Sequence, residues 1–201
     1  MIENFQAALG RITAFEAVAI GSGIVYVLLI LRRNRWGWVA GALSSSIYVV
    51  LSARARLPMQ SMLQTYYVVM AVYGWSSWTR NAEQQGGRIF RWPMRRHLLA
   101  ILFILAATFL SARLLATETQ AAWPILDSLT TWTCLLATWL VARSVLENWC
   151  YWIFADSITV FLFTQQGYLS TAGLFLIYII VACFGLRAWW RRYRLQSQVL
   201  Q

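Results

Sequence analysis

Seven apolar stretches, separated by short arginine-bearing segments, dominate this chain of 201 residues. Each has roughly 16–23 residues, and at about 1.5 Å rise per residue most can cross a hydrocarbon core of about 30 Å. Hydrophobic residues make up 60% of the chain, above the roughly 45–50% of soluble domains. Because lipid cannot satisfy backbone polar groups, the stretches must be helices. We therefore expect an all-α integral membrane protein with transmembrane helices near residues 12–31, 36–53, 58–78, 97–116, 123–141, 149–164 and 168–190.

The sixth stretch is the shortest, and a start one turn earlier, at Ser144, would lengthen it. Tryptophans mark the ends of many stretches, and most are expected to be anchors at the membrane interface. They are Trp36, Trp38, Trp75, Trp78, Trp123, Trp149, Trp189 and Trp190.

The basic residues predict the orientation of the chain. All 17 are arginines, with no lysine, and they occur in short runs between apolar stretches. This pattern is typical of membrane loops and does not indicate a nucleic-acid partner. Excess positive charge marks the cytoplasmic side, so we expect the N-terminus outside and the C-terminus inside an inner membrane. The cytoplasmic set is Arg32, Arg33, Arg35, Arg80, Arg88, Arg91, Arg95, Arg96, Arg143, Arg187, Arg191, Arg192 and Arg194.

The third and seventh stretches resemble each other. Residues 67–74 read YVVMAVYG and residues 178–185 read YIIVACFG, at an offset of 111 that also aligns Trp78 with Trp189. Shared Tyr, Gly and Trp at fixed spacing indicate an internal duplication. A weaker match at an offset of 113 aligns Trp36 with Trp149, which predicts a two-residue difference in a loop.

The duplication predicts an architecture of two three-helix bundles with one helix between them. A single linker helix lets the two units run parallel, giving a 3+1+3 arrangement of seven helices. We expect a first unit over residues 1–80, a cytoplasmic loop with the linker helix over 81–122, and a second unit over 123–201. The loop itself is expected over residues 81–96. Parallel repeats are typical of transporters, whose binding site lies between the halves near the midplane.

Two intramembrane polar groups are the main site candidates, because such groups cost free energy in lipid. Asp156 shares one face of the sixth stretch with Trp149 and Trp152, at i, i+3 and i+7. A flat cation would suit two indole faces and a carboxylate. Gln64 shares a face of the third stretch with Tyr67, and its amide can both donate and accept hydrogen bonds. The structural alternative is that both groups join neighbouring helices.

Other polar residues favour structural roles. Glu16 and Asp127 are expected to pair with Arg11, Arg54 or Arg113, and Ser44, Ser45 and Ser46 to allow close helix packing. Cys134, Cys150 and Cys183 are expected to be small buried apolar residues. No nucleophile motif or metal-ligand spacing accompanies the single His97, so we expect neither an enzyme, a cofactor nor a metal.

Several motifs together resemble the vitamin-precursor transporters of the PnuC type. The resemblance runs from about Val27 to Trp190, and its most specific parts occur at the ends of the helices. They are Leu63-Gln64, Tyr73-Gly74-Trp75 with Trp78, Glu147-Asn148-Trp149 with Trp152, Gln166-Gly167-Tyr168, and Gly185-Leu186-Arg187-Ala188-Trp189. The resemblance implies a fold similar to the SWEET sugar transporters, a homotrimer, and facilitated diffusion of nicotinamide riboside.

The resemblance also implies a binding site. It makes Gln64 and Trp152 substrate contacts, with Asn148, Trp149 and Asp156 close by. Tyr67 and its copy Tyr178 complete the candidate set. Some nicotinamide riboside carriers of this type have an amide at the position of Asp156. An acid there suits a cationic substrate, and both nicotinamide riboside and thiamine are cationic, so thiamine is an alternative and neutral riboflavin is less favoured. The alternative of a different class is a non-transporting membrane scaffold or receptor.

Overall fold

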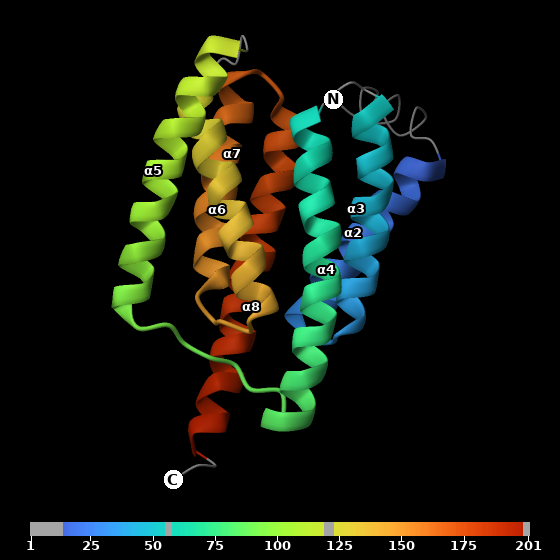
Figure 1. The fold of residues 1–201 in the computed structure, drawn as a ribbon. Helices are drawn as coiled ribbons and strands as arrows, with labels where there is room; N and C mark the ends of the chain where they lie inside the picture. Colours follow the sequence, from blue (N-terminus) through green and yellow to red (C-terminus); the bar gives the residue numbers. More distant parts are fainter. Residues whose placement is uncertain (1–13, 55–57, 119–122, 199–201) are drawn as a thin grey trace. The chain divides into compact units, whose positions relative to one another are not determined.

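Seven α-helices occupy the part of the chain that the computed structural model describes, which is residues 14–54, 58–118 and 123–198 (Figure 1). One helix corresponds to each apolar stretch, so the all-α prediction is confirmed. Arg11 and Arg56 lie outside the described residues. The helices are α2 (Ala14–Leu31), α3 (Trp36–Arg54), α4 (Pro58–Gln85), α5 (Met94–Glu118), α6 (Pro124–Ala142), α7 (Asn148–Gln165) and α8 (Leu169–Gln198).

The helix surfaces are those of a multi-pass membrane protein. On α5, for example, Leu99, Leu102 and Phe109 are each more than 60% exposed, as expected for side chains that face lipid. Within the described residues, α2, α3, α5, α6 and α8 are long and apolar enough to cross a membrane. The two helices that fall short of this apolarity, α4 and α7, carry Gln64 and Asp156.

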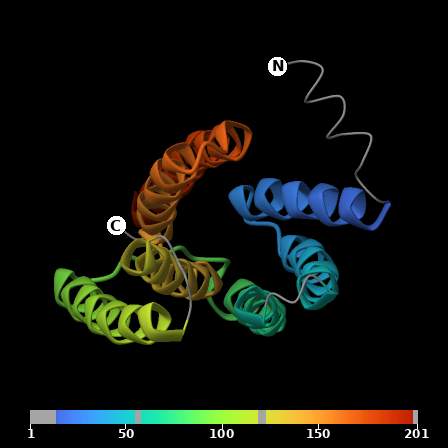
Figure 2. The ribbon, with the colours of Figure 1, turned by 90° about the horizontal axis from the view of Figure 1, so that it is seen from above.

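The chain forms two compact units, Met1–Arg80 and Asn81–Gln201. In the first unit α2 packs on α3 and α3 packs on α4 (Figure 2). In the second unit α5, α6, α7 and α8 pack in chain order, each on the next. Phe103 of α5 meets Trp132 of α6 edge to face at 5.7 Å between ring centroids.

A tryptophan–glycine–tryptophan contact joins α3 to α4 in the first unit. The Trp38 indole lies so close to Gly74 that a Cβ there would meet the ring at 2.3 Å. Trp78, one helical turn later, packs edge to face against Trp38 at 5.4 Å and 83°. Only glycine lets the ring approach the α4 backbone this closely.

The same contact joins α7 to α8 in the second unit. A Cβ at Gly185 would meet the Trp149 ring at 2.6 Å, and Trp149 packs edge to face against Trp189 at 5.6 Å and 87°. Trp78 and Trp189 are only 3% and 1% exposed. The prediction that Trp38, Trp78, Trp149 and Trp189 are interface anchors is therefore wrong, because facing glycines let their rings pack inside each unit.

The turns before α3 and α7 are also alike. Arg33 and Ser144 have φ of 61° and 60°, in the left-handed region that non-glycine residues rarely adopt. Each ends the preceding helix with the same pair of backbone hydrogen bonds. In the first unit, Arg33 N–H donates to Ile30 O and Asn34 N–H donates to Leu29 O. In the second, Ser144 N–H donates to Val141 O and Val145 N–H donates to Leu140 O. A start of the sixth helix at Ser144 is thus excluded, and α7 begins at Asn148.

All these features recur at one offset. Arg33 corresponds to Ser144, Trp38 to Trp149, Gly74 to Gly185 and Trp78 to Trp189, always 111 residues apart. The predicted match at 113 is wrong, because Trp38 and not Trp36 occupies the position of Trp149.

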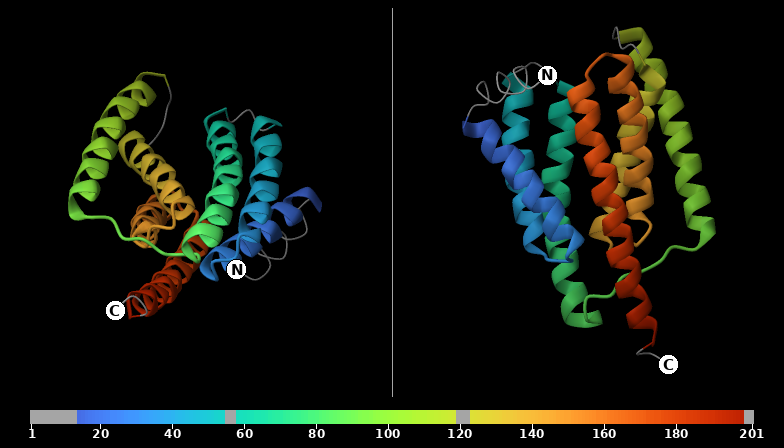
Figure 3. Two further views of the ribbon diagram at one scale, coloured as in Figure 1. Left: turned by 60° about the horizontal axis from the view of Figure 1, so that its bottom comes forward. Right: turned by 180° about the vertical axis from the view of Figure 1, so that it is seen from behind.

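The segment between α4 and α5 is shorter than predicted and is attached to the second unit (Figure 3). It covers only residues 86–93, because α4 continues to Gln85 and α5 starts at Met94. Phe90 forms an isolated parallel bridge with Val145, and Ile89 N–H donates to Gln196 Oε1 on α8 at 3.1 Å. The predicted loop is therefore a docked segment, residues 86–93, held against the second unit.

Candidate functional site

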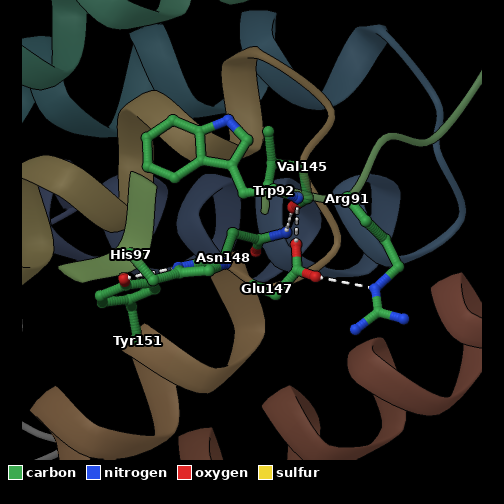
Figure 4. Close-up of polar contacts among 7 residues, drawn as sticks. All are labelled: Arg91, Trp92, His97, Val145, Glu147, Asn148 and Tyr151. Atoms are coloured by element: carbon green, nitrogen blue, oxygen red, sulfur yellow. Dashed lines mark hydrogen bonds and ion pairs between the residues drawn. The ribbon is translucent and has the colours of Figure 1, made fainter. Parts of the chain in front are cut away.

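Polar contacts at the start of α7 fix the segment that carries most of the predicted site residues (Figure 4). Glu147, just before α7, accepts hydrogen bonds from Arg91 Nε at 2.9 Å and from Trp92 N–H at 3.3 Å. The hydrogen bond to Glu147 raises the pKa of the Arg91 guanidinium, which therefore keeps its positive charge. One turn into α7, Tyr151 Oη lies 2.9 Å from His97 Nδ1 on α5.

Asn148 and Trp149 are buried inside the second unit. Asn148 is 0% exposed, and its Nδ2 donates to Val145 O at 2.6 Å. Its Oδ1 and the Trp149 Nε1 find no hydrogen-bond partner among the described residues. Both side chains therefore pack inside the second unit, Trp149 against Gly185.

Trp152 and Asp156 lie one turn apart on the same face of α7. Asp156 is 6% exposed, and within the described part of the chain no donor or cation pairs with its carboxylate. Trp152 is half-buried, and no ring of the described residues packs against its indole. A carboxylate this buried is costly without a partner. Asp156 therefore offers a carboxylate, and Trp152 an aromatic face, that the described residues leave without a partner.

Gln64 and Tyr67 occupy one face of α4 in the first unit. Both are half-buried, and Tyr67 packs against Tyr66 with ring centroids 5.9 Å apart. Among the described residues no hydrogen bond involves the Gln64 amide. An amide in this state can bind a polar group that the protein does not supply.

Tyr178 belongs to an aromatic cluster between α7 and α8. Its ring meets Phe175 edge to face at 5.7 Å, and Phe175 stacks on Phe163 at 5.7 Å and 14°. Phe175 occupies the position that corresponds to Gln64 at the offset of 111. The second unit thus has an apolar ring where the first has an amide.

Several structural roles are resolved. Ser44 Oγ donates to Ala19 O on α2 at 2.8 Å, which confirms its predicted packing role. Glu16 and Asp127 correspond at the offset of 111, and Asp127 forms no ion pair with the described residues. Cys150 and Cys183 are exposed on the chain, so the prediction that they are buried is wrong; neither is in a disulfide.

Sequence reasoning missed the pairing of Arg91 with Glu147 and the role of Trp38. Extending the offset of 111 backward from Gly74 would have found Trp38. Nothing local in the sequence links Arg91 to Glu147, because they are 56 residues apart. The described residues contain no group of three or more His, Cys, Asp or Glu side chains that could hold a metal ion.

Comparisons with known proteins place this arrangement in a wider group. The profile of the family described as "Nicotinamide mononucleotide transporter" matches residues 13–191. The riboflavin/roseoflavin transporter RibM of Streptomyces davaonensis is 25% identical over 182 residues, covering 88% of this chain and 84% of RibM. The nicotinamide riboside transporter PnuC of Escherichia coli is 22% identical over 200 residues, covering 87% of this chain and 84% of PnuC.

The fold also has a counterpart among solved structures. The crystal structure of the vitamin B3 transporter PnuC superimposes with a TM-score of 0.74 at 20% sequence identity. The match covers 96% of this chain and 87% of that one. The all-α membrane fold is therefore shared between the two proteins.

Proposed function

The chain belongs to the nicotinamide mononucleotide transporter family, and from this we propose that it carries a vitamin precursor across the inner membrane by facilitated diffusion. The family consists of transporters, in agreement with the prediction that the chain is not an enzyme. The first candidate substrate is nicotinamide riboside, the compound named for the Escherichia coli relative.

The observation that carries the choice of substrate is the unpaired carboxylate of Asp156 beside Trp152. Asp156 is 6% exposed, and an ionised carboxylate in that position gains most from a cation that is desolvated with it. The pyridinium of nicotinamide riboside is flat and positively charged. It can lie against an indole face while a carboxylate balances its charge.

We assign the remaining predicted residues two kinds of role. Gln64 and Tyr67 of α4 and Tyr178 of α8 are proposed to contact the substrate, with the Gln64 amide binding a carboxamide or a ribose hydroxyl. Asn148 and Trp149 are proposed to be positioning residues. They are buried inside the second unit and set the orientation of Trp152 and Asp156 from the beginning of α7.

We propose that the fold is a 3+1+3 arrangement of parallel repeats with α5 as the linker helix. The support is that the three helices of the first unit have counterparts in α6, α7 and α8 of the second. At one offset of 111, α2 (Ala14–Leu31) corresponds to residues 125–142 and α4 (Pro58–Gln85) begins at the counterpart of Leu169. In transporters with repeats of this kind, the two repeats rock against each other around a binding site near the membrane midplane.

In the orientation that we propose, the N-terminus lies outside and the C-terminus in the cytoplasm, as the arginine distribution predicts. A homotrimer with a SWEET-like fold is the assembly that the family resemblance implies. Light scattering of the detergent-purified protein would test the trimer, and labelling of single cysteines from either side would test the orientation.

Riboflavin transport is the second candidate function. It is favoured by the match to RibM, which at 25% identity is slightly more similar to this chain than the Escherichia coli PnuC is. Riboflavin has a flat ring that can stack on Trp152 but no positive charge for Asp156. Thiamine, which is cationic, is a further alternative.

Uptake into proteoliposomes tests the proposal. Purified protein is reconstituted, and accumulation of radiolabelled nicotinamide riboside, riboflavin and thiamine is compared with that in protein-free vesicles. We expect saturable uptake of nicotinamide riboside that needs no ion gradient or ATP. Uptake of riboflavin alone would replace the first candidate by the second, and no uptake of any of the three would favour a non-transporting scaffold or receptor.

A further inference from the structure

The second unit contains a pocket of about 410 Å³ that the transport proposal does not use. It lies where the docked segment after α4 meets α7 and α8. Arg91 and Arg187 both line it, together with Trp190 and Glu147. All these residues belong to the second unit, so the pocket is complete within that unit.

Positive charge is available at this pocket. Arg91 uses Nε for Glu147, and its terminal nitrogens lie on the side away from that carboxylate (Figure 4). Its guanidinium also lies 5.1 Å from the centroid of the Trp190 ring. Arg187 is exposed, and among the described residues no acceptor or carboxylate pairs with it. One of the two arginines is thus held in place, and the other is unpaired.

The rest of the pocket is apolar. Leu146, Leu186, Cys150 and Cys183 contribute its remaining lining, and none of them offers a charge or a strong hydrogen bond. A free phosphate would contact only the arginines, because a small anion needs hydrogen-bond donors on several sides and the apolar lining supplies none. An amphipathic anion can use both parts, with its headgroup at the arginines and its chain along Leu186 and the two cysteines.

We propose that this pocket binds an anionic phospholipid. The headgroup phosphate is bound by Arg91 and Arg187, and the acyl chain lies over Leu186, Cys150 and Cys183. Basic pockets at the cytoplasmic ends of transmembrane helices are suited to anionic headgroups. Since Arg91 also pairs with Glu147, the lipid would join the docked segment to α7 and α8 without contact to Trp152 or Asp156.

Native mass spectrometry of the full chain in detergent tests the proposal. The protein is incubated with dioleoyl phosphatidylglycerol or with dioleoyl phosphatidylcholine, which has the same chains and no net charge. We expect retention of phosphatidylglycerol in preference to phosphatidylcholine. Arg187→Gln should weaken that retention roughly fivefold, the amount that one basic residue contributes near an anionic lipid. Arg95→Gln on α5, outside the pocket lining, is the control with the same charge change and should retain the lipid normally.

The native cysteines give a second measurement that does not depend on mass spectrometry. Phosphatidylglycerol should slow maleimide labelling of Cys150 and Cys183 and leave Cys134, which is outside the pocket lining, unchanged. Equal retention of the two lipids, or equal loss in Arg187→Gln and Arg95→Gln, would overturn the proposal. Protection of the cysteines by inorganic phosphate alone would also overturn it and indicate a free-anion site. None of these results depends on which vitamin is transported.

Discussion

The helices α2–α4 and α6–α8 share their packing and differ in their polar residues. Both have a left-handed turn, at Arg33 and Ser144, and both pack a tryptophan on a glycine of the third helix, at Gly74 and Gly185. In contrast, Ser45 of α3 corresponds to Asp156 of α7. The contacts that hold the helices together are alike in the two sets, whereas the positions of the proposed substrate contacts differ.

The aromatic residues show the same divergence. In the first unit Gly41 lies against the Tyr26 ring, where a Cβ would meet it at 2.8 Å. The corresponding residues of the second unit are Trp152 and Ala137. The large ring lies on α2 in the first unit and on α7 in the second, one turn from Asp156. Among the described residues, only the second unit therefore carries an indole and a carboxylate on one helix face.

The largest effect on stability is expected from the shared packing. Gly74→Ala and Gly185→Ala place a Cβ against a tryptophan ring that neighbouring side chains hold, and overpacking of this kind costs about 1–3 kcal/mol. Thermal unfolding in detergent should show a similar loss for both variants. Gly173→Ala on α8, where a Cβ meets nothing within 4 Å, is the matched control and should be neutral or slightly stabilising. A loss of stability in only one of the two variants would contradict the equivalence of the two glycine contacts.

A smaller effect is expected where the units differ. Trp152→Leu keeps an apolar side chain but removes the ring, and loss of a cation–aromatic contact should weaken nicotinamide riboside binding by about 0.5–2 kcal/mol. The affinity can be measured by competition in the uptake assay. Trp123→Leu changes an exposed tryptophan just before α6 and should leave the affinity unaltered. An equal change of affinity in the two variants would mean that Trp152 does not contact the substrate.

The smallest effect is expected for the ion pair between Arg91 and Glu147. This pair has no counterpart in the first unit, where Trp36 corresponds to Glu147. The Arg91 side chain is 47% exposed and that of Glu147 is 16% exposed, so solvent screens the pair. A double-mutant cycle with Arg91→Gln and Glu147→Gln should give a coupling energy of at most about 1 kcal/mol. A coupling of several kcal/mol would mean that the docked segment is far more important for folding than its exposure indicates.

Much of the fold could be predicted from the sequence, because the length of each apolar stretch can be read from local composition. The helices begin and end within a few residues of the apolar stretches, apart from the polar continuations of α4 and α8 past Trp78 and Trp190. Those continuations are stabilised by contacts distant in sequence, such as Ile89 N–H to Gln196 Oε1. Composition alone could not reveal them.

The errors concern tertiary contacts. Tryptophan at a helix end favours an interface anchor on average, but Trp149 is 4% exposed because Gly185 leaves room for its ring. The left-handed turn at Ser144 has no glycine to mark it. For the candidate site, the common face of Trp152 and Asp156 follows from helical spacing, whereas the burial of Asn148 depends on how α7 packs within its unit.

The most direct test of the account is nicotinamide riboside uptake by Asp156→Asn, measured beside the wild type and Ser45→Ala. The amide keeps the size of the side chain and removes the charge. If Asp156 balances the charge of the substrate, its loss should cost about 2–5 kcal/mol of binding, seen as a rise in KM of at least roughly thirtyfold. Ser45→Ala, at the corresponding position of the first unit, should transport normally. An unchanged KM in Asp156→Asn would contradict the account.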